Sequence, residues 1–186
     1  MNEQRLILSI EGQIIKCFTP QATDLYCKFG YSYGSGWSLA SGPNEGITQQ
    51  SKLDSNNSCV WNYPINVSFK AERPFGWPQI VMAIYGKNSF GLDMVVGYGA
   101  VHFPTTQGSH LIDVSLFTPA STSIMQKIIG FITGSSPEFI NLNFIAGGEA
   151  REVTKTESQG KVQLSINVIF GGLESLDLNT ETTNKN

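Results

Sequence analysis

Two histidines, His102 and His110, are the side chains in this 186-residue sequence best suited to proton transfer or metal binding near neutral pH. Neither stands at a metal-ligand interval from the other or from a cysteine. His102 falls in an expected strand just before Pro104, and His110 begins the next expected strand. We therefore expect both imidazoles to be packed or hydrogen-bonded structural groups. We assign no catalytic residue and no metal ligand from the sequence.

The three cysteines, Cys17, Cys27 and Cys59, include no Cys-x-x-Cys pair, and an odd number cannot be fully paired within one chain. The N-terminal residues are polar, and the apolar run that follows them is too short for a signal peptide. Together these features indicate a reducing, cytoplasmic environment. Cys27 and Cys59 fall on the apolar faces of expected strands, so we expect both to be small core residues.

The carboxylates are too widely spaced for the calcium sites found in some β-sandwiches. Calcium takes about six to eight oxygen ligands, which neighbouring loops must supply together. No Asp-x-Asp pair occurs among the aspartates, which are Asp24, Asp54, Asp93, Asp113 and Asp177. We therefore expect no calcium-gated lipid binding.

Common enzyme motifs are also absent from the sequence. No Gly-x-Ser-x-Gly turn is present to expose a nucleophile. Gly97-Tyr98-Gly99 lacks the third glycine of a dinucleotide-binding loop, and a strand rather than a helix is expected after it. The sequence thus predicts a protein that is not an enzyme and that needs no cofactor.

The charge pattern argues against nucleic acid as a partner. The formal net charge is −3, and the twelve Lys and Arg residues are scattered, with no cluster of four or more. Such a chain lacks the basic surface that attracts a phosphate backbone. The same dispersion counts against strong electrostatic binding to anionic lipid. No apolar run approaches the roughly 18 residues of a membrane span.

Apolar and polar residues alternate through most of the chain, as they do in strands that bury one face. This pattern predicts strands over 6–14, 24–34, 59–70, 94–103, 110–117 and 160–170. Residues 80–85 are apolar throughout, which favours a central strand covered on both faces. Pro64 indicates an edge position or a bulge within 59–70. Turn residues separate these segments, so the expected fold class is all-β, an antiparallel sandwich or barrel.

One segment departs from this alternation. Apolar residues recur at helical spacing over about 120–133, after Thr118 and Pro119, which suit the start of a helix. We predict one short amphipathic helix there, ended by Gly134. A single domain is expected over 4–172. The polar stretch 173–186 has almost no apolar periodicity and is predicted to be a disordered tail.

Large aromatic residues on expected loops are the main candidates for binding a partner. Phe75 and Trp77 lie in a rigid Pro- and Gly-containing loop over 73–79, and Phe90 lies in the next loop. Such side chains can anchor a protein partner. The first loop could equally plug the end of a sandwich, or insert weakly into a membrane. We predict Phe75, Trp77 and Phe90 to be partner-binding residues.

Several short motifs together resemble the signature of the B9 domain family. They are Gly76-Trp77-Pro78-Gln79-Ile80-Val81, Tyr85-Gly86, Phe90-Gly91, Gly97-Tyr98-Gly99 and His102-x-Pro104, with Asp24-Leu25-Tyr26-Cys27-Lys28 and Val60-Trp61-Asn62-Tyr63-Pro64-Ile65 nearer the start of the chain. The resemblance spans nearly all of residues 5–170. It implies a divergent C2-like β-sandwich, a fold known from lipid-binding modules.

The same resemblance implies a role at the base of the cilium, in the transition zone, at the basal body and its cytoskeleton. The family works there within the Meckel syndrome (tectonic-like) complex, which supports ciliogenesis and restricts diffusion between plasma and ciliary membranes. The implied partners are B9 domain-containing protein 2 and the Meckel syndrome type 1 protein. No catalytic residue is carried over from the family. The alternative is a calcium-independent phospholipid-binding module at the ciliary membrane.

Overall fold

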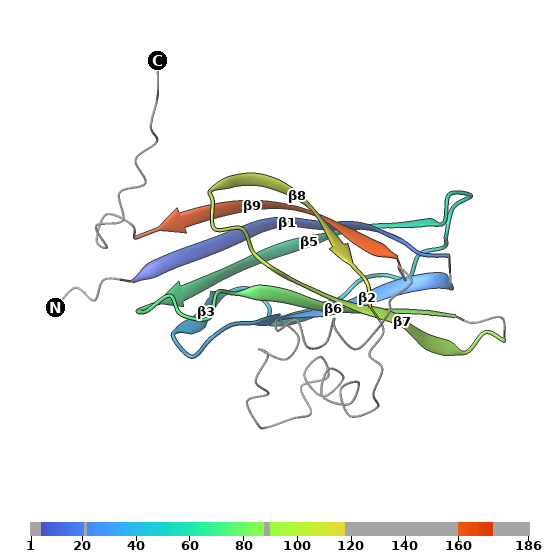
Figure 1. Ribbon diagram of the computed structural model, residues 1–186, viewed down its shortest axis with the longest axis horizontal. Helices are drawn as coiled ribbons and strands as arrows, with labels where there is room; N and C mark the ends of the chain where they lie inside the picture. The colour runs from blue at the N-terminus through green and yellow to red at the C-terminus, as the bar shows by residue number, and fades with distance from the viewer. Residues whose placement is uncertain (1–4, 21, 88–89, 118–159, 173–186) are drawn as a thin grey trace, which may run out of the picture.

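Two antiparallel sheets lie face to face in the computed structural model, which describes residues 5–20, 22–87, 90–117 and 160–172. One sheet is ordered β3 (Trp37–Ser41), β5 (Ser58–Ala71), β1 (Leu6–Phe18), β9 (Lys161–Gly171), β8 (Gly108–Ser115). The other is ordered β4 (Glu45–Ile47), β2 (Thr23–Ser32), β6 (Gln79–Lys87), β7 (Asp93–His102). Figure 1 shows the two layers. The predicted antiparallel β-sandwich is confirmed.

The predicted helix over about 120–133 lies outside the described residues, as do the first residue of the predicted 4–172 domain and the predicted 173–186 tail. The described ranges contain strands, turns and bends. Within these ranges, no helix has the length and apolarity needed to cross a bilayer.

Side chains from both sheets meet between the layers and form the main core. Trp61 on β5 is 3% exposed, and Cys27 on β2 is fully buried, as the alternation on their strands predicts. The indole N–H of Trp61 donates a hydrogen bond to the Leu25 carbonyl across the core, at 3.1 Å. Because side chains alternate between the two faces of a strand, this burial also fixes the register of β5 against β1.

β6 is apolar on both faces because it contributes to two separate clusters. Ile80, Met82 and Ile84 belong to the main core between the sheets. Val81 and Ala83 instead pack with Tyr98 on the other face of the four-stranded sheet. β6 lies between β2 and β7, so the predicted central position of residues 80–85 is confirmed.

Pro64 lies in a part of β5 that has only one neighbouring strand. β3 pairs with β5 only from Ser68 to Ala71, so the first ten residues of β5 pair with β1 alone. The β1–β5 ladder also has a bulge next to Pro64, where Asn62 adopts a φ of 47°. The proline, which lacks an N–H donor, therefore fits where the sequence predicted, at an edge and beside a bulge.

The strand pairing determines which loops share an end of the sandwich. At the left end in Figure 1, β1 begins beside the end of β5, because Leu6 pairs with Ala71. The 72–78 loop and the start of β3 lie at this same end, since Trp37 also pairs with Ala71. The connection between β6 and β7 lies at the opposite end, next to the Lys87–Asp93 pair.

Candidate binding surfaces at the two ends of the sandwich

Phe75 and Phe90 are the two most exposed large apolar residues described, and the fold places them at opposite ends of β6. Phe75 is 82% exposed in the loop before β6, and Phe90 is 88% exposed in the connection after it. At about 3.3 Å per residue, β6 separates the two loops by roughly 26 Å. The predicted partner-binding residues therefore belong to two surfaces, which we name the Phe75 end and the Phe90 end.

Trp77, the third predicted partner-binding residue, is half-buried and packs against the core. Its indole N–H donates a hydrogen bond to the Phe103 carbonyl at 2.8 Å. Its ring lies edge-on to Trp37, with centroids 5.1 Å apart, and also contacts Phe170 at 6.0 Å. These contacts support the alternative that the sequence left open, in which the loop residue closes the end of the sandwich.

The loop that carries Phe75 is held in place by its own backbone. The Phe75 N–H donates to the Arg73 carbonyl, and the Gly34 N–H donates to the Gly76 carbonyl, each at 2.8 Å. Gly76 has a φ of 72°, and a Cβ added there would lie 2.6 Å from the Gly34 Cα. Only glycine fits this close approach. Phe75 is thus presented to solvent on a braced turn.

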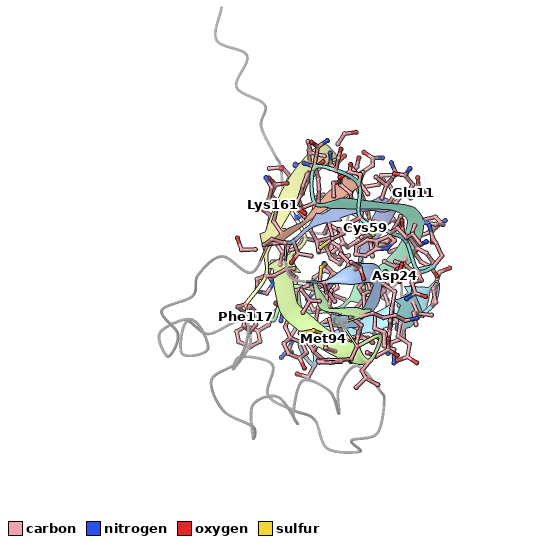
Figure 2. The ribbon with its side chains drawn as sticks, turned by 90° about the vertical axis from the view of Figure 1, so that its right-hand side faces the viewer. Glu11, Asp24, Cys59, Met94, Phe117 and Lys161 are labelled. Atoms are coloured by element: carbon pink, nitrogen blue, oxygen red, sulfur yellow. The ribbon has the colours of Figure 1, made fainter. Side chains whose placement is uncertain are left out.

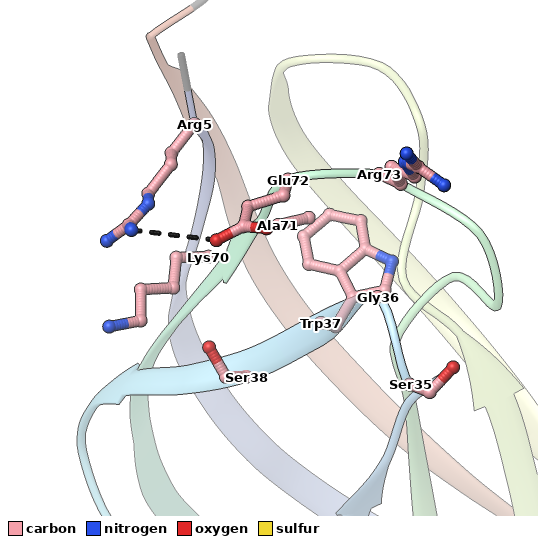
Figure 3. A pocket seen from close by; sticks show the side chains of 9 residues that line it. All are labelled: Arg5, Ser35, Gly36, Trp37, Ser38, Lys70, Ala71, Glu72 and Arg73. Carbon is pink, nitrogen blue, oxygen red and sulfur yellow. Dashed lines mark ion pairs between the residues drawn. The ribbon is translucent and has the colours of Figure 1, made fainter. Parts of the chain in front are cut away.

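A cavity of about 520 Å³ opens beside this loop at the Phe75 end. Figure 3 shows its polar lining, to which β1, β3, β5 and their flanking residues contribute Arg5, Ser35, Ser38, Lys70, Glu72 and Arg73. The guanidinium of Arg5 pairs with the Glu72 carboxylate at 3.5 Å. Among the described residues, Lys70 and Arg73 make no ion pair. The lining therefore carries three positive charges and one negative charge.

Trp37 forms the buried part of this cavity's lining. It is only 4% exposed and its ring is braced by Trp77. Its indole N–H is buried without a hydrogen-bond partner in the part of the chain that the structure describes. In Figure 3 the indole lies between Arg5 and Lys70 on one side and Arg73 on the other. The cavity thus combines a rigid aromatic base with a basic rim.

The Phe90 end, which faces the viewer in Figure 2, has a different character. Phe90 and Leu92 are 88% and 65% exposed on either side of Gly91, whose φ is 75°. β7 follows directly. Among the described residues, its outer edge makes only one bridge, between Tyr98 and Phe117. Exposed apolar side chains therefore adjoin the unpaired first half of an edge strand.

The histidines have the structural role that the sequence predicts. His102 Nδ1 donates to the Trp77 carbonyl and His110 Nε2 donates to the Thr106 carbonyl, both at 3.0 Å. A search for three or more His, Cys, Asp or Glu side chains placed to share a metal ion finds none within the described ranges.

The cysteines are buried free thiols. Burial, with a smaller contribution from Cys59, raises the pKa of Cys17 to about 12. Burial also raises the pKa of Cys27 well above its usual value. Because the thiolate is the reactive form, these groups are poor nucleophiles in the folded protein. They pack in the core, as predicted for Cys27 and Cys59.

A sequence profile described as "Ciliary basal body-associated, B9 protein" matches residues 8–169. The chain belongs to the B9-C2 family. It is 43% identical to B9 domain-containing protein 1 of Xenopus laevis, over 94% of this chain and 89% of that protein. It is 30% identical to B9 domain-containing protein 2 of Xenopus laevis, over 89% of this chain and 93% of the relative. The C2-like β-sandwich predicted from the B9 resemblance is thereby confirmed.

One solved structure with the same general architecture is a C2 domain of a plant extended synaptotagmin 1. It shares 10% identity with this B9-C2 chain, with a TM-score of 0.40, over 87% of this chain and 92% of that domain. The family assignment rests on the profile and on the relatives, not on this structure.

Sequence reasoning missed the basic cavity of this B9-C2 domain. Arg5, Lys70 and Arg73 are far apart in sequence or separated by an acid, so no run of basic residues announces them. The β1–β5 ladder brings them together, because Ile7 pairs with Lys70 and Leu6 with Ala71. An antiparallel pairing of the predicted strands 6–14 and 59–70 would have been the signal.

Proposed function

We propose that this chain is a non-enzymatic assembly component at the base of the cilium. It joins the other B9-domain proteins in the tectonic-like (Meckel syndrome) complex of the transition zone. In this role it supports ciliogenesis and the diffusion barrier between plasma and ciliary membranes. B9 domain-containing protein 2 and the Meckel syndrome type 1 protein are the proposed partners.

The observation that carries this proposal is the match of residues 8–169 to a ciliary, basal-body-associated family. The 43% identity with B9 domain-containing protein 1 covers most of both chains and supports the same role. The described side chains offer an assembly role more than a chemical one, because the buried thiols are protonated and both histidines are tied to backbone carbonyls.

The Phe90 end is the surface we assign to the protein partner. Large apolar residues at the centre of an interface supply most of its binding energy when water is excluded from them. Phe90 and Leu92 provide such residues at the tip of the β6–β7 connection. Next to them, the unpaired N–H and C=O groups of β7 can accept a partner strand or loop. Phe75 remains a predicted binding residue, but it lies at the other end of the domain.

Co-purification of the full chain with B9 domain-containing protein 2 tests this proposal. The parent is expected to form a stable complex. Phe90→Ala is expected to weaken it by about 2–4 kcal/mol, the cost of a hot-spot residue. Phe75→Ala is the matched control, because it removes the same ring from an equally exposed loop. A parent chain that binds neither B9 partner would refute the assembly role.

The location of the contact can fail separately. Equal weakening by Phe90→Ala and Phe75→Ala, or weakening by Phe75→Ala alone, would leave assembly standing but remove it from the Phe90 end. Neither change is expected to alter the melting temperature, since both side chains are largely exposed.

A further inference from the structure

We propose that the cavity at the Phe75 end binds the phosphate of an anionic lipid headgroup while Phe75 enters the membrane interface. This inference goes beyond the assembly role and uses the opposite end of the sandwich. It assigns Arg5, Lys70 and Arg73 as the phosphate-binding side chains, and it requires no calcium.

Charge is the first reason. Three basic side chains and one carboxylate line the cavity, so its surroundings are positive in a chain whose net charge is −3. Arg guanidinium groups bind phosphate through paired N–H donors, and a Lys ammonium adds a compact positive charge. The hydroxyls of Ser35 and Ser38 add further donors to the lining. Such a lining matches a phosphate better than it matches a neutral or cationic group.

The shape of the site is the second reason. A volume of about 520 Å³ lies within the range of small-ligand sites, roughly 300–1,000 Å³. The base is rigid because Trp37 is held edge-on by Trp77. Its unpaired indole N–H sits between the basic residues and would gain an acceptor from a bound anion. The cavity is therefore built before a ligand arrives.

Phe75 is the reason for choosing a membrane over a phosphate in solution. Its N–H bonds to the Arg73 carbonyl, and its own carbonyl lies against Gly34, next to Ser35 of the cavity. An 82% exposed ring on a braced loop beside a phosphate site suits the interface of a bilayer, where apolar rings and basic side chains act together.

Vesicle flotation of the full chain tests the proposal, without calcium and at low ionic strength. The vesicles contain phosphatidylcholine alone, or with phosphatidylserine, or with a phosphatidylinositol phosphate at matched total charge. Binding is expected only with acidic lipid, and most strongly with the phosphatidylinositol phosphate, whose phosphate can enter the cavity. Higher salt is expected to weaken it.

Variants separate the cavity from the rest of the surface. Lys70→Ala and Arg73→Ala are each expected to weaken binding about fivefold, as loss of one basic residue near an anionic surface does. Glu72→Gln is expected to strengthen it, because it removes the only carboxylate in the lining. Phe75→Ala is expected to weaken it about tenfold through the lost apolar contact.

Two controls sit at the other end of the domain. Lys52→Ala removes an equal charge from an exposed site near the Leu25–Ser51 bridge, and Phe90→Ala removes an equal ring. Neither is expected to change vesicle binding.

The proposal is overturned if the cavity variants bind vesicles as the parent does, or if phosphatidylserine serves as well as the phosphatidylinositol phosphate. It is also overturned if a soluble inositol phosphate binds while vesicles do not. Loss of B9 domain-containing protein 2 on Phe75→Ala, with no vesicle binding by the parent, would make this end a protein contact instead. None of these outcomes depends on whether the assembly role holds, because the flotation assay contains no partner.

Discussion

Replacing Trp77 with alanine decides whether this residue closes the sandwich or binds a partner. The change removes the edge-on contacts with Trp37 and Phe170 and leaves the Phe103 carbonyl without its indole donor. Trp→Ala in a full core costs about 3–5 kcal/mol. Trp77 is only half-buried, which lowers this figure, while the lost hydrogen bond adds about 1 kcal/mol. We expect the free energy of unfolding to fall by about 2–4 kcal/mol, within the estimates cited for these terms.

Urea denaturation followed by circular dichroism measures this loss. Trp77→Phe serves as the matched variant, because it keeps an aromatic ring but cannot donate to Phe103, and it is expected to lose about 1 kcal/mol. An unchanged free energy of unfolding for Trp77→Ala, together with lost binding to B9 domain-containing protein 2, would refute the packing role. It would also restore the interface role that the sequence predicted.

Three further predictions follow from the core and from one surface pair. Trp61→Ala is expected to cost about 3–5 kcal/mol in urea denaturation, since the indole is 3% exposed and donates across the core; parent-like stability would show that the register of β5 is wrong. Cys17, Cys27 and Cys59 are buried, and the pKa of each is raised, chiefly by burial, so thiol reagents at mildly alkaline pH are expected to label the protein only after denaturation; rapid labelling of the native chain would contradict this. Hydrogen bonds from Lys161 and Gln163 lower the pKa of Asp113 from its usual 3.8, so its small stabilising effect is present above that pH and is lost as the pH falls through the lower folded value. Melting temperatures across the acid range are accordingly expected to fall less steeply for Asp113→Asn than for the parent, and parallel curves would refute the assignment.

The strands with a buried face could be predicted from the sequence because their alternation is long and regular. β6 is the clearest example, since Val81 and Ala83 indicate a second apolar contact that the fold provides. β3 and β4 could not be predicted. β3 buries only Trp37 fully, and β4 has three residues with no buried side chain. In such short edge strands the turn residues around 41–46 dominate the pattern, and only tertiary pairing defines the strand.

The two surfaces show the same limit in physical terms. Sequence reasoning identified Phe75 and Phe90 as exposed loop aromatics, and both are exposed. It could not place them at opposite ends, because that depends on which strand lies between them. It also could not distinguish Trp77 from its neighbour Phe75, since only the Phe103 carbonyl and the Trp37 ring make one of them a packing residue.

Separation of the two ends has a consequence for assembly. A partner at Phe90 and a membrane at Phe75 would be roughly 26 Å apart along β6, so neither would block the other. Double substitution of Phe75 and Phe90 is therefore expected to show additive losses in the two binding assays, because distant sites without shared contacts seldom couple.

Hydrogen–deuterium exchange of the chain, alone and in complex with B9 domain-containing protein 2, tests the proposed assembly contact most directly. The account predicts that complex formation slows exchange in residues 90–97, at the apolar tip and the unpaired half of β7, and leaves residues 72–78 unchanged. Protection confined to residues 72–78, or no change anywhere when the two proteins are mixed, would contradict it.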